Sequence, residues 1–430
     1  MRVGLISFHS FFQPGGVKRH VLGLKEEFKK RGIYSKIIAP RRNRLEDYGK
    51  DVILLGTSFP LSFSGGQSDF DINFNPLAID RVLQKEKFDV LHFHNFGFPS
   101  TWQILEKSES LNILTFHANI EGSKFLKRFP IFLYLLNKIV QWKIDGIIGV
   151  ASLNLKVFKD FKGPKVVIPN GIDLEEFYPA PFDKKCRVNP QALKIKKFCD
   201  NKVNILFVGR IEKRKGLIYL LKAFKILQNK FSNTELPSVK EARGKKRMKS
   251  SSPLRLIIVG EGELKEYCQN YVKENNLKEV CFEGQITGPK LPSYYRTCDI
   301  YCSPAIYGES FGIVLIEAMA SNVPVVAFAN EGYQQVLKGK GSKFLVKPRD
   351  YKTLAEKLEI LIKNPQLRKE MGEWGQTEAQ KYSWPRITDR VLNFYEFCRK
   401  EKQKRQKFTL DKFLKKIYNK NILSWLKKPI

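Results

Sequence analysis

The 430-residue chain lacks the features that mark several classes of protein. Its seven cysteines contain no C-x-x-C pair and no even framework, so neither disulfides nor a cysteine-bound zinc ion is indicated and a reducing compartment is expected. No apolar run reaches the roughly 18 residues that a membrane-spanning helix needs, and no secretory signal is visible. These absences favour a cytoplasmic, globular protein without a membrane span.

Two common phosphate-binding signatures are also missing. The first apolar segment, residues 2–8, is not followed by G-x-G-x-x-G, and no G-x4-G-K-[ST] sequence occurs in the chain. These absences exclude the dinucleotide fingerprint and the P-loop. Helix-turn-helix, zinc-finger and RNA-binding signatures are absent too. A nucleic-acid binder nevertheless stays open as an alternative, because the net charge of +33 suits one.

Apolar segments typical of strands alternate with helical patterns along the chain, and most strands end at a turn. This alternation predicts an α/β protein with parallel, doubly wound sheets. One sheet is predicted from residues 2–8, 35–39, 52–55, 90–94, 113–117, 146–150 and 165–168. A second sheet is predicted from residues 203–208, 254–259, 279–282, 300–303 and 323–328.

Two carboxylates flank a predicted loop-to-helix junction. Glu309 and Glu317 stand eight residues apart, and a helix is expected to open at Gly312. Eight residues make about two helical turns, so both carboxylates can lie on one side of that helix. The free N–H groups at a helix start favour an anion. A phosphate at the helix start and hydroxyls beside the carboxylates describe a nucleotide sugar.

A basic loop follows the strand predicted at residues 203–208. Gly209 ends the strand, and Arg210 and Lys215 supply cations before the next helix. Each charge-assisted bond from such groups to a diphosphate contributes about 1.5–3 kcal/mol. The spacing of cations in this loop therefore predicts the second half of a diphosphate site.

The first 120 residues hold all five histidines and a glycine turn. Gly15 and Gly16 leave room for a backbone to approach phosphate. His92 and His94 share one face of a predicted strand, but no further ligands stand at suitable spacing, so no metal site is predicted. His117 ends a strand at the edge where ligands collect in parallel sheets; a buried structural histidine is the alternative.

The segment around Glu309 and Glu317 resembles the E-x7-E signature of the retaining glycosyltransferases of family 4. Its flanks are most similar to the phosphatidylinositol mannosyltransferase branch, and the Pro-Gly-Gly-Val and Thr-Phe-His sequences ending at Val17 and His117 resemble further family motifs. The resemblance covers nearly all of residues 1–398. It implies GT-B architecture, with two Rossmann-like doubly wound parallel-sheet lobes facing a central cleft.

The same resemblance implies a hexosyltransferase that moves mannose from GDP-mannose onto a membrane lipid headgroup such as phosphatidylinositol, with no metal or other cofactor. The implied catalytic residues are His117, Arg210, Lys215 and Glu309. The implied donor-binding residues are Gly15, Gly16, Gly209, Arg210, Lys215, Glu309, Ser310, Phe311, Gly312, Ile313 and Glu317. UDP-glucose or UDP-N-acetylglucosamine remains an alternative donor, and a polysaccharide or small molecule an alternative acceptor. Phe12 departs from the branch at a position where a polar acceptor contact is expected.

The resemblance also implies a division of the chain. Residues 1–177 are expected to form the acceptor-binding lobe and residues 178–383 the nucleotide-sugar-binding lobe, with a helix at about 384–398 crossing back onto the first lobe. Residues 237–253 form a basic insertion that is predicted to be disordered. Asn322 stands where relatives usually have glycine, so a left-handed helix-end conformation is expected there.

The segment Arg399–Ile430 carries twelve lysines and arginines against two acidic residues, with an apolar stripe at helical spacing. A basic amphipathic helix of this kind predicts peripheral binding to the anionic inner face of a membrane, with Lys124–Arg128 as a second candidate contact. Packing of the stripe on the body of the protein is the alternative. An inactive membrane-surface scaffold is a further rival to the enzyme.

Overall fold

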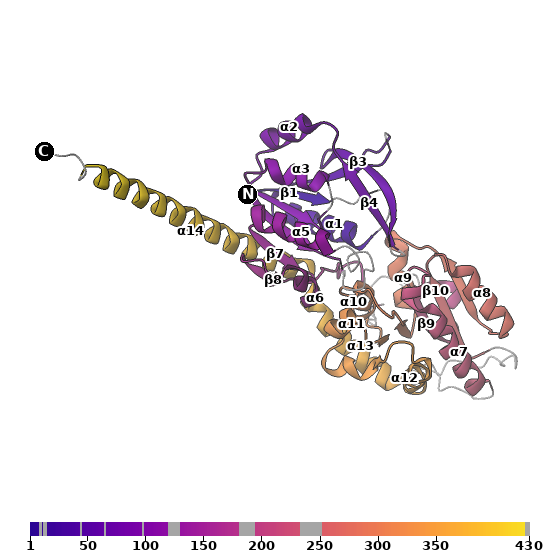
Figure 1. Ribbon diagram of the computed structural model, residues 1–430. Coiled ribbons are helices and arrows are strands. Elements are labelled where there is room, and N and C mark those ends of the chain that lie inside the picture. The colour runs from indigo at the N-terminus through magenta and orange to yellow at the C-terminus, as the bar shows by residue number, and fades with distance from the viewer. Residues whose placement is uncertain are drawn as a thin grey trace.

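The computed structural model describes residues 1–7, 11, 15–43, 45–63, 66–96, 99–118, 130–179, 194–232 and 252–425. Within these ranges the side chains of residues 60–63, 66–69, 130, 132 and 407–425 are not described. The chain forms two α/β lobes, and a long C-terminal helix leaves the first lobe and extends away from both (Figure 1). The predicted two-lobed α/β fold is confirmed.

The first lobe is built on an eight-stranded sheet with the order β4-β3-β2-β1-β5-β6-β7-β8. Its strands are β1 (Arg2–Ser7), β2 (Tyr34–Arg41), β3 (Val52–Phe63), β4 (Gly66–Ile72), β5 (Val90–His94), β6 (Leu111–Phe116), β7 (Gly146–Gly149) and β8 (Lys165–Val167). Its helices are α1 (Gly16–Lys30), α2 (Pro76–Glu86), α3 (Ser100–Lys107), α5 (Pro130–Lys143) and α6 (Ser152–Leu155).

One edge of this sheet differs from the sequence prediction. The strand predicted at residues 52–55 continues as β3 to Phe63, and β4 then returns antiparallel to it. The reason lies in the alternation of polar and apolar residues after Gly56, which suits a two-stranded edge ribbon rather than a buried parallel strand. The other strand pairs of the sheet are parallel, as expected.

The second lobe has a six-stranded parallel sheet with the order β11-β10-β9-β12-β13-β14. Its strands are β9 (Val203–Val208), β10 (Leu254–Val259), β11 (Val280–Gly284), β12 (Ile300–Ser303), β13 (Val325–Phe328) and β14 (Leu345–Val346). Its helices are α7 (Leu217–Phe231), α8 (Lys265–Glu274), α9 (Leu291–Thr297), α10 (Ile313–Ala320), α11 (Glu331–Val336), α12 (Tyr351–Lys363) and α13 (Pro365–Ala379).

Each sheet is covered on both faces by helices whose apolar residues form separate cores. In the second lobe α7 and α12 pack on one face and α9 and α10 on the other. In the first lobe α2, α3 and α5 cover one face, while α1 shares the other with α14 (Trp384–Trp425) through Ile387, Val391 and Phe394. The start of α14 therefore belongs physically to the first lobe.

Two chain crossings between the lobes lie side by side. The N–H of Ile172 donates to the carbonyl of Tyr382 at 2.8 Å, and the N–H of Trp384 donates to the carbonyl of Ile172 at 3.3 Å. The Trp384 ring fills the space beside Gly23 and Gly171, where an added Cβ would lie 2.2 and 2.4 Å from ring atoms. This packing fixes the beginning of α14 at the junction of the lobes.

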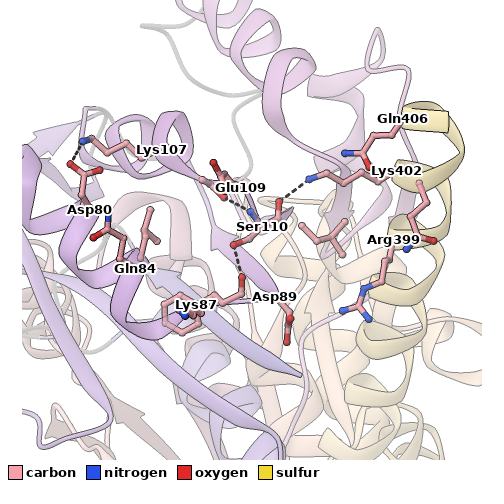
Figure 2. Close-up of a pocket in the computed structure, with 15 residues that line it drawn as sticks. Asp80, Gln84, Lys87, Asp89, Lys107, Glu109, Ser110, Arg399, Lys402 and Gln406 are labelled. Carbon is pink, nitrogen blue, oxygen red and sulfur yellow. Dashed lines mark hydrogen bonds and ion pairs between the residues drawn. The ribbon is translucent and has the colours of Figure 1, made fainter. Parts of the chain in front are cut away.

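Further along, α14 closes a hollow of about 840 Å³ with α2 and the segments that precede β5 and β6 (Figure 2). Lys402 donates to the carbonyl of Ser110 at 2.8 Å and pairs with Asp145 at 2.9 Å. The hollow lies at the amino ends of strands whose carboxyl ends carry the candidate site. The contacts of Lys402 therefore hold α14 at the edge of the sheet opposite the candidate site.

The end of α10 confirms one local expectation. Asn322 has φ 62°, the left-handed conformation predicted for it. An added Cβ on Gly372 would lie 2.4 Å from the carbonyl oxygen of Asn322, so α13 packs directly on this turn. The turn sends the chain from α10 into β13, next to the strand that carries the candidate site.

Candidate functional site

The loops after β9 and β12 lie directly against each other at the carboxyl edge of the second sheet. The N–H of Ile306 donates to the carbonyl of Arg214 at 2.8 Å. Gly216 has φ 69°, and an added Cβ there would lie 2.1 Å from the carbonyl oxygen of Pro304. A side chain at position 216 is incompatible with this approach, so glycine is what lets the basic loop touch the acidic one.

Glu309 is held by two cations from the basic loop. Its Oε1 atom lies 2.7 Å from Nζ of Lys215 and 3.0 Å from Nη1 of Arg214, and its side chain is 11% exposed. Burial alone would raise the pKa of Glu309, but the charges of Lys215 and Arg214 outweigh it and hold the pKa below its ordinary value. The structure thus brings together an ionised carboxylate and two cations.

The sequence predicted Arg210 as the arginine of the basic loop, but in the structure Arg214 is the arginine that contacts Glu309. Arg210 is half exposed, and its guanidinium lies 3.6 Å from Glu212. Arg214, which the sequence analysis missed, pairs with both Glu212 and Glu309. The signal was its place beside Lys215 in a Lys-Arg-Lys run, which forms a single 3-10 turn that directs neighbouring cations into one loop.

The helix expected after Glu309 begins at Ile313, with Gly312 as its N-cap. Gly312 has φ 97°, and an added Cβ would lie 2.6 Å from the ring of Tyr333. Glu309 lies four residues before the first residue of α10 and is therefore not on the helix. The prediction that helical spacing aligns Glu309 with Glu317 on one side of α10 was wrong. Phe311 is buried with its ring 5.5 Å from Tyr382, so its side chain packs in the core.

Glu317 lies on α10, is 1% exposed and connects the two lobes. It accepts a hydrogen bond from the hydroxyl of Tyr295 at 2.7 Å and forms an ion pair with Arg19 in the first helical turn of α1. The Glu317 charge raises the pKa of Arg19. Sequence reasoning missed Arg19, although its position three residues after Gly16 already placed it near the predicted phosphate turn.

Gly15 has extended backbone, and Gly16 begins α1. Among the described residues other than the immediate chain neighbours, no atom lies within 4 Å of a Cβ added to Gly15 or Gly16. This space is compatible with the predicted approach of a phosphate. The neighbouring residues Phe12 and Pro14 lie outside the described residues.

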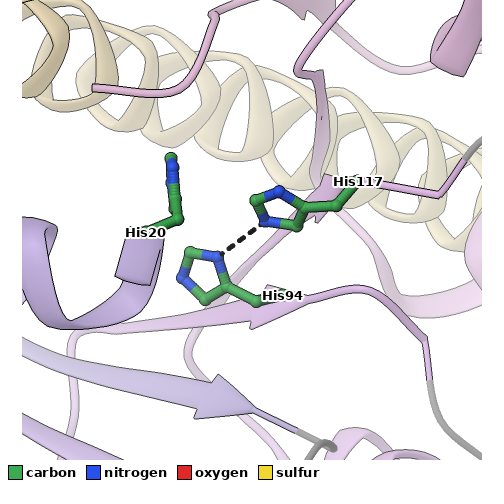
Figure 3. A group of neighbouring side chains, drawn as sticks. All are labelled: His20, His94 and His117. Carbon is green, nitrogen blue, oxygen red and sulfur yellow. Dashed lines mark hydrogen bonds between the residues drawn. The ribbon is translucent and has the colours of Figure 1, made fainter. Parts of the chain in front are cut away.

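Three histidines meet beside the amino end of α1 (Figure 3). Nδ1 of His94 lies 3.3 Å from Nε2 of His117, and the ring of His20 lies 4.8 Å from that of His117. Burial lowers the pKa of His20 to about 4 and the pKa of His94 well below its ordinary value, so both rings are neutral at pH 7. His20 was missed, although it follows Gly16 by one helical turn.

His92 differs from this group. Its Nε2 lies 2.6 Å from the hydroxyl of Thr115 and its Nδ1 lies 2.6 Å from the hydroxyl of Tyr395. Both ring nitrogens are therefore engaged inside the protein. The sequence analysis considered His92 and His94 as half of a metal site. In the structure His94 instead lies with His20 and His117.

Helix α5 of the first lobe presents an apolar stripe to solvent, which we call the α5 surface. Ile131, Tyr134, Leu135 and Trp142 are each 49–57% exposed, and α5 contains no acidic residue. The predicted contact at 124–128 and the insertion at 237–251 lie outside the described residues, as do the side chains of the tail after residue 406. Among the described residues, no helix combines the length and apolar character needed to cross a bilayer.

Two protein-family models match the chain. Residues 14–176 match Glycosyltransferase Family 4, and residues 189–378 match the glycosyl transferases of group 1. The phosphatidyl-myo-inositol mannosyltransferase of Mycobacterium leprae is 31% identical over 406 residues, which cover 92% of this chain and 96% of the relative. The enzyme of the same name from Mycolicibacterium smegmatis is 30% identical, with 92% and 94% coverage.

Solved structures share the two-lobed arrangement. Sucrose-phosphate synthase from Thermosynechococcus elongatus matches with a TM-score of 0.69 at 21% identity, covering 92% of this chain and 98% of that one. HepE from Anabaena in complex with UDP matches with a TM-score of 0.68 at 18% identity, covering 92% and 100%. At these identities the matches establish the fold, and the expected GT-B architecture is confirmed.

We predict that Lys215→Met lowers the free energy of unfolding by about 1–3 kcal/mol at pH 7, because ionised Glu309 stays buried without its nearest cation. The depressed pKa of Glu309 means that its contribution to wild-type stability is present above 4.5 and is lost as the pH falls through the folded value. In the variant Arg214 still lies 3.0 Å from Glu309, but less of the cost of burial is offset, so the pKa of Glu309 lies higher than in the wild type and the penalty disappears on protonation. The difference between the two proteins should therefore narrow as the pH falls toward and below 4.5.

Urea unfolding of both proteins at several pH values measures this difference. Lys265→Met is the control, because its pair with Glu261 at 2.7 Å joins side chains that are 30% and 44% exposed. Removing this exposed pair should change stability by less than about 1 kcal/mol. A constant difference between wild type and Lys215→Met across the pH range would contradict the burial of an ionised Glu309.

Proposed function

This chain belongs to glycosyltransferase family 4, and we propose that it is a retaining hexosyltransferase that moves mannose from GDP-mannose onto a membrane lipid headgroup such as phosphatidylinositol. The observation that carries the proposal is Glu309, fixed by Lys215 and Arg214 four residues before the start of α10. Relatives that are 30–31% identical over nearly the whole chain bear the name phosphatidyl-myo-inositol mannosyltransferase, which supports this choice of sugar and acceptor.

The cations of the basic loop would bind the donor diphosphate and stabilise it as the leaving group. Lys215 and Arg214 lie beside Glu309 in the same loop. The Arg210 guanidinium is half exposed and lies 3.6 Å from Glu212, a long contact that a phosphate could replace. The free N–H groups at the start of α10, from Ile313 onward, add positive potential for the same anion. With three cations and a helix start on one diphosphate, no metal ion is required to neutralise it.

The two carboxylates would hold the sugar and the nucleoside. Glu309 is ionised and can accept hydrogen bonds from hydroxyls of the hexose. Glu317 would accept from the ribose, which requires Arg19 to release it. Arg19 lies one helical turn from Gly16, where the diphosphate is expected. On donor binding, Arg19 would exchange its ion pair with Glu317 for a contact with the diphosphate.

His117 would contact the transferred hexose from the first lobe. The departing diphosphate would take the proton of the acceptor hydroxyl on the face that it leaves, so the new bond keeps the α configuration. Closure of the lobes would exclude water and prevent hydrolysis of the donor.

The lipid acceptor would be reached at the cytoplasmic face of a membrane. The α5 surface joins exposed aromatic and aliphatic side chains to Lys138, whose Nζ lies 5.4 Å from the Tyr134 ring. Aromatic residues and lysines of this kind suit the interface of an anionic bilayer. The basic tail beyond residue 399 provides further positive charge, and we assign the net charge of the chain to lipid rather than nucleic acid.

We predict that Glu309→Gln and Arg210→Ala each lower the turnover of mannosyl transfer by at least about 100-fold, because each removes charge from the reacting diphosphate sugar. Arg210→Ala should unfold at nearly the wild-type temperature, because the Arg210 side chain is half exposed. Glu309→Gln leaves the nearly buried Lys215 without its carboxylate, so it should unfold at a lower temperature but stay folded under the assay conditions. Glu373→Gln, which changes a carboxylate that is 58% exposed on α13, is the matched control. Near-normal turnover in either site variant would contradict the assigned roles.

The donor is identified by thermal shift with GDP-mannose, UDP-glucose and UDP-N-acetylglucosamine. At 100 times its dissociation constant a ligand stabilises the folded state by about 2.7 kcal/mol, so the correct donor should raise the unfolding temperature clearly. We expect GDP-mannose to give the largest rise. A larger rise with a UDP sugar would overturn the donor assignment and leave the transferase assignment in place.

We predict that the double variant Leu135→Glu/Trp142→Glu binds vesicles containing phosphatidylinositol and phosphatidylserine at least tenfold more weakly than wild type, because two acidic groups replace inserted apolar ones. Co-sedimentation measures the bound fraction. Ile360→Glu changes an apolar residue that is 44% exposed on the other lobe, and it should bind like wild type. Equal binding by all three proteins would exclude the α5 surface as the contact.

A further inference from the structure

The group of His20, His94 and His117 has the geometry of a metal site. One ring nitrogen from each histidine lies within 4.8 Å of the other two. In a tetrahedral zinc site with bonds of about 2.0–2.1 Å, ligand nitrogens lie about 3.3–3.4 Å apart. The 3.3 Å separation between Nδ1 of His94 and Nε2 of His117 already has this value, so a movement of His20 alone completes the set.

The surroundings of the three rings also favour an ion. Nδ1 of His20, a residue that is 4% exposed, is buried without a hydrogen-bond partner. An unsatisfied buried nitrogen costs free energy, and a metal ion on Nε2 of His20 would fix the proton on Nδ1, from which it can be donated to a neighbour. The unpartnered amide oxygen of Asn170 is close enough to influence the pKa of His20 and can act as such an acceptor.

We propose that His20, His94 and His117 bind a single Zn²⁺ or similar transition-metal ion. The ligand set consists of neutral imidazoles, which suit Zn²⁺, Co²⁺, Ni²⁺ and Cu²⁺ and not Mg²⁺ or Ca²⁺. His20 and His94 are buried, whereas His117 is partly exposed, so we expect the open coordination position on the side of His117 (Figure 3). A water molecule or a substrate hydroxyl can occupy it.

Occupancy of this site inhibits the transferase. The bound ion takes a nitrogen of His117 and stands at the amino end of α1, beside the space assigned to the hexose and the diphosphate. Zn²⁺ therefore competes with the donor. This consequence rests on the proposed function, whereas the binding of the ion does not.

The site is tested on the full chain after treatment with a chelator. Titration with Co²⁺, followed by absorption, and equilibrium dialysis with Zn²⁺ should both show one ion per chain at micromolar concentration. The Co²⁺ spectrum should lack thiolate charge-transfer bands, which separates this site from the exposed Cys199. His20→Gln and His94→Gln should each weaken binding by at least about tenfold.

His92→Gln is the matched control, since His92 is as buried as His94 and lies on the same strand but is bonded to Thr115 and Tyr395. It should bind one ion with unchanged affinity. X-ray absorption at the zinc edge of the wild-type protein counts imidazole ligands and needs no variant; three are expected. Binding weaker than millimolar, a sulfur ligand, or equal binding by all variants would overturn the site.

Inhibition is measured separately as the effect of Zn²⁺ on the Michaelis constant for the donor. The constant should rise with Zn²⁺ while turnover at saturating donor stays unchanged. Stoichiometric binding without this rise would overturn the inhibitory role and retain the site. A protein that binds one ion and transfers no sugar at any metal concentration would instead contradict the proposed function.

Discussion

The contact between Lys215 and Glu309 is the interaction on which the candidate site depends. It joins a loop from one strand to a loop from a neighbouring strand at 2.7 Å, and both side chains are nearly buried. A carboxylate in such a place is unfavourable unless a cation compensates it, so neither residue can be replaced without penalty to the other. The close approach of the two loops, which Gly216 permits, makes the pair possible. The resulting arrangement places two cations next to one carboxylate, and the proposed diphosphate-sugar site rests on it.

A second ion pair extends this arrangement across the junction of the lobes. Arg19 of α1 reaches Glu317 of α10, and the chain crossings at Ile172 and Trp384 also join the lobes, with the Trp384 ring packed beside Gly23 of α1. The empty protein thus satisfies buried Glu317 with its own guanidinium. A donor that offers ribose hydroxyls to Glu317 and phosphate to Arg19 exchanges one set of contacts for another. Such an exchange of contacts would make donor binding shift the equilibrium between different arrangements of the two lobes.

Sequence reasoning found the fold because buried parallel strands leave continuous apolar runs, and residues such as Glu309, Lys215 and His117 stand at the ends of those runs. It also gave the conformation of Asn322. It missed β14, which has two residues, and the return of β3 into β4, whose pattern belongs to an edge ribbon. Arg19, Arg214 and His20 stand beside motifs that the sequence revealed, but their contacts with Glu317, Glu309 and the other histidines join distant segments, and no local pattern encodes such contacts.

Calorimetric titration of the wild type and Lys215→Met with the nucleoside diphosphate of the donor tests the diphosphate site most directly. Loss of one charge-assisted contact of about 1.5–3 kcal/mol predicts that the variant binds at least about tenfold more weakly, while Lys369→Met, which changes a lysine that is 67% exposed on α13, binds like wild type. Equal affinity of Lys215→Met and wild type, or no binding of any nucleoside diphosphate to the wild type, would contradict a diphosphate site at the Lys215–Glu309 contact.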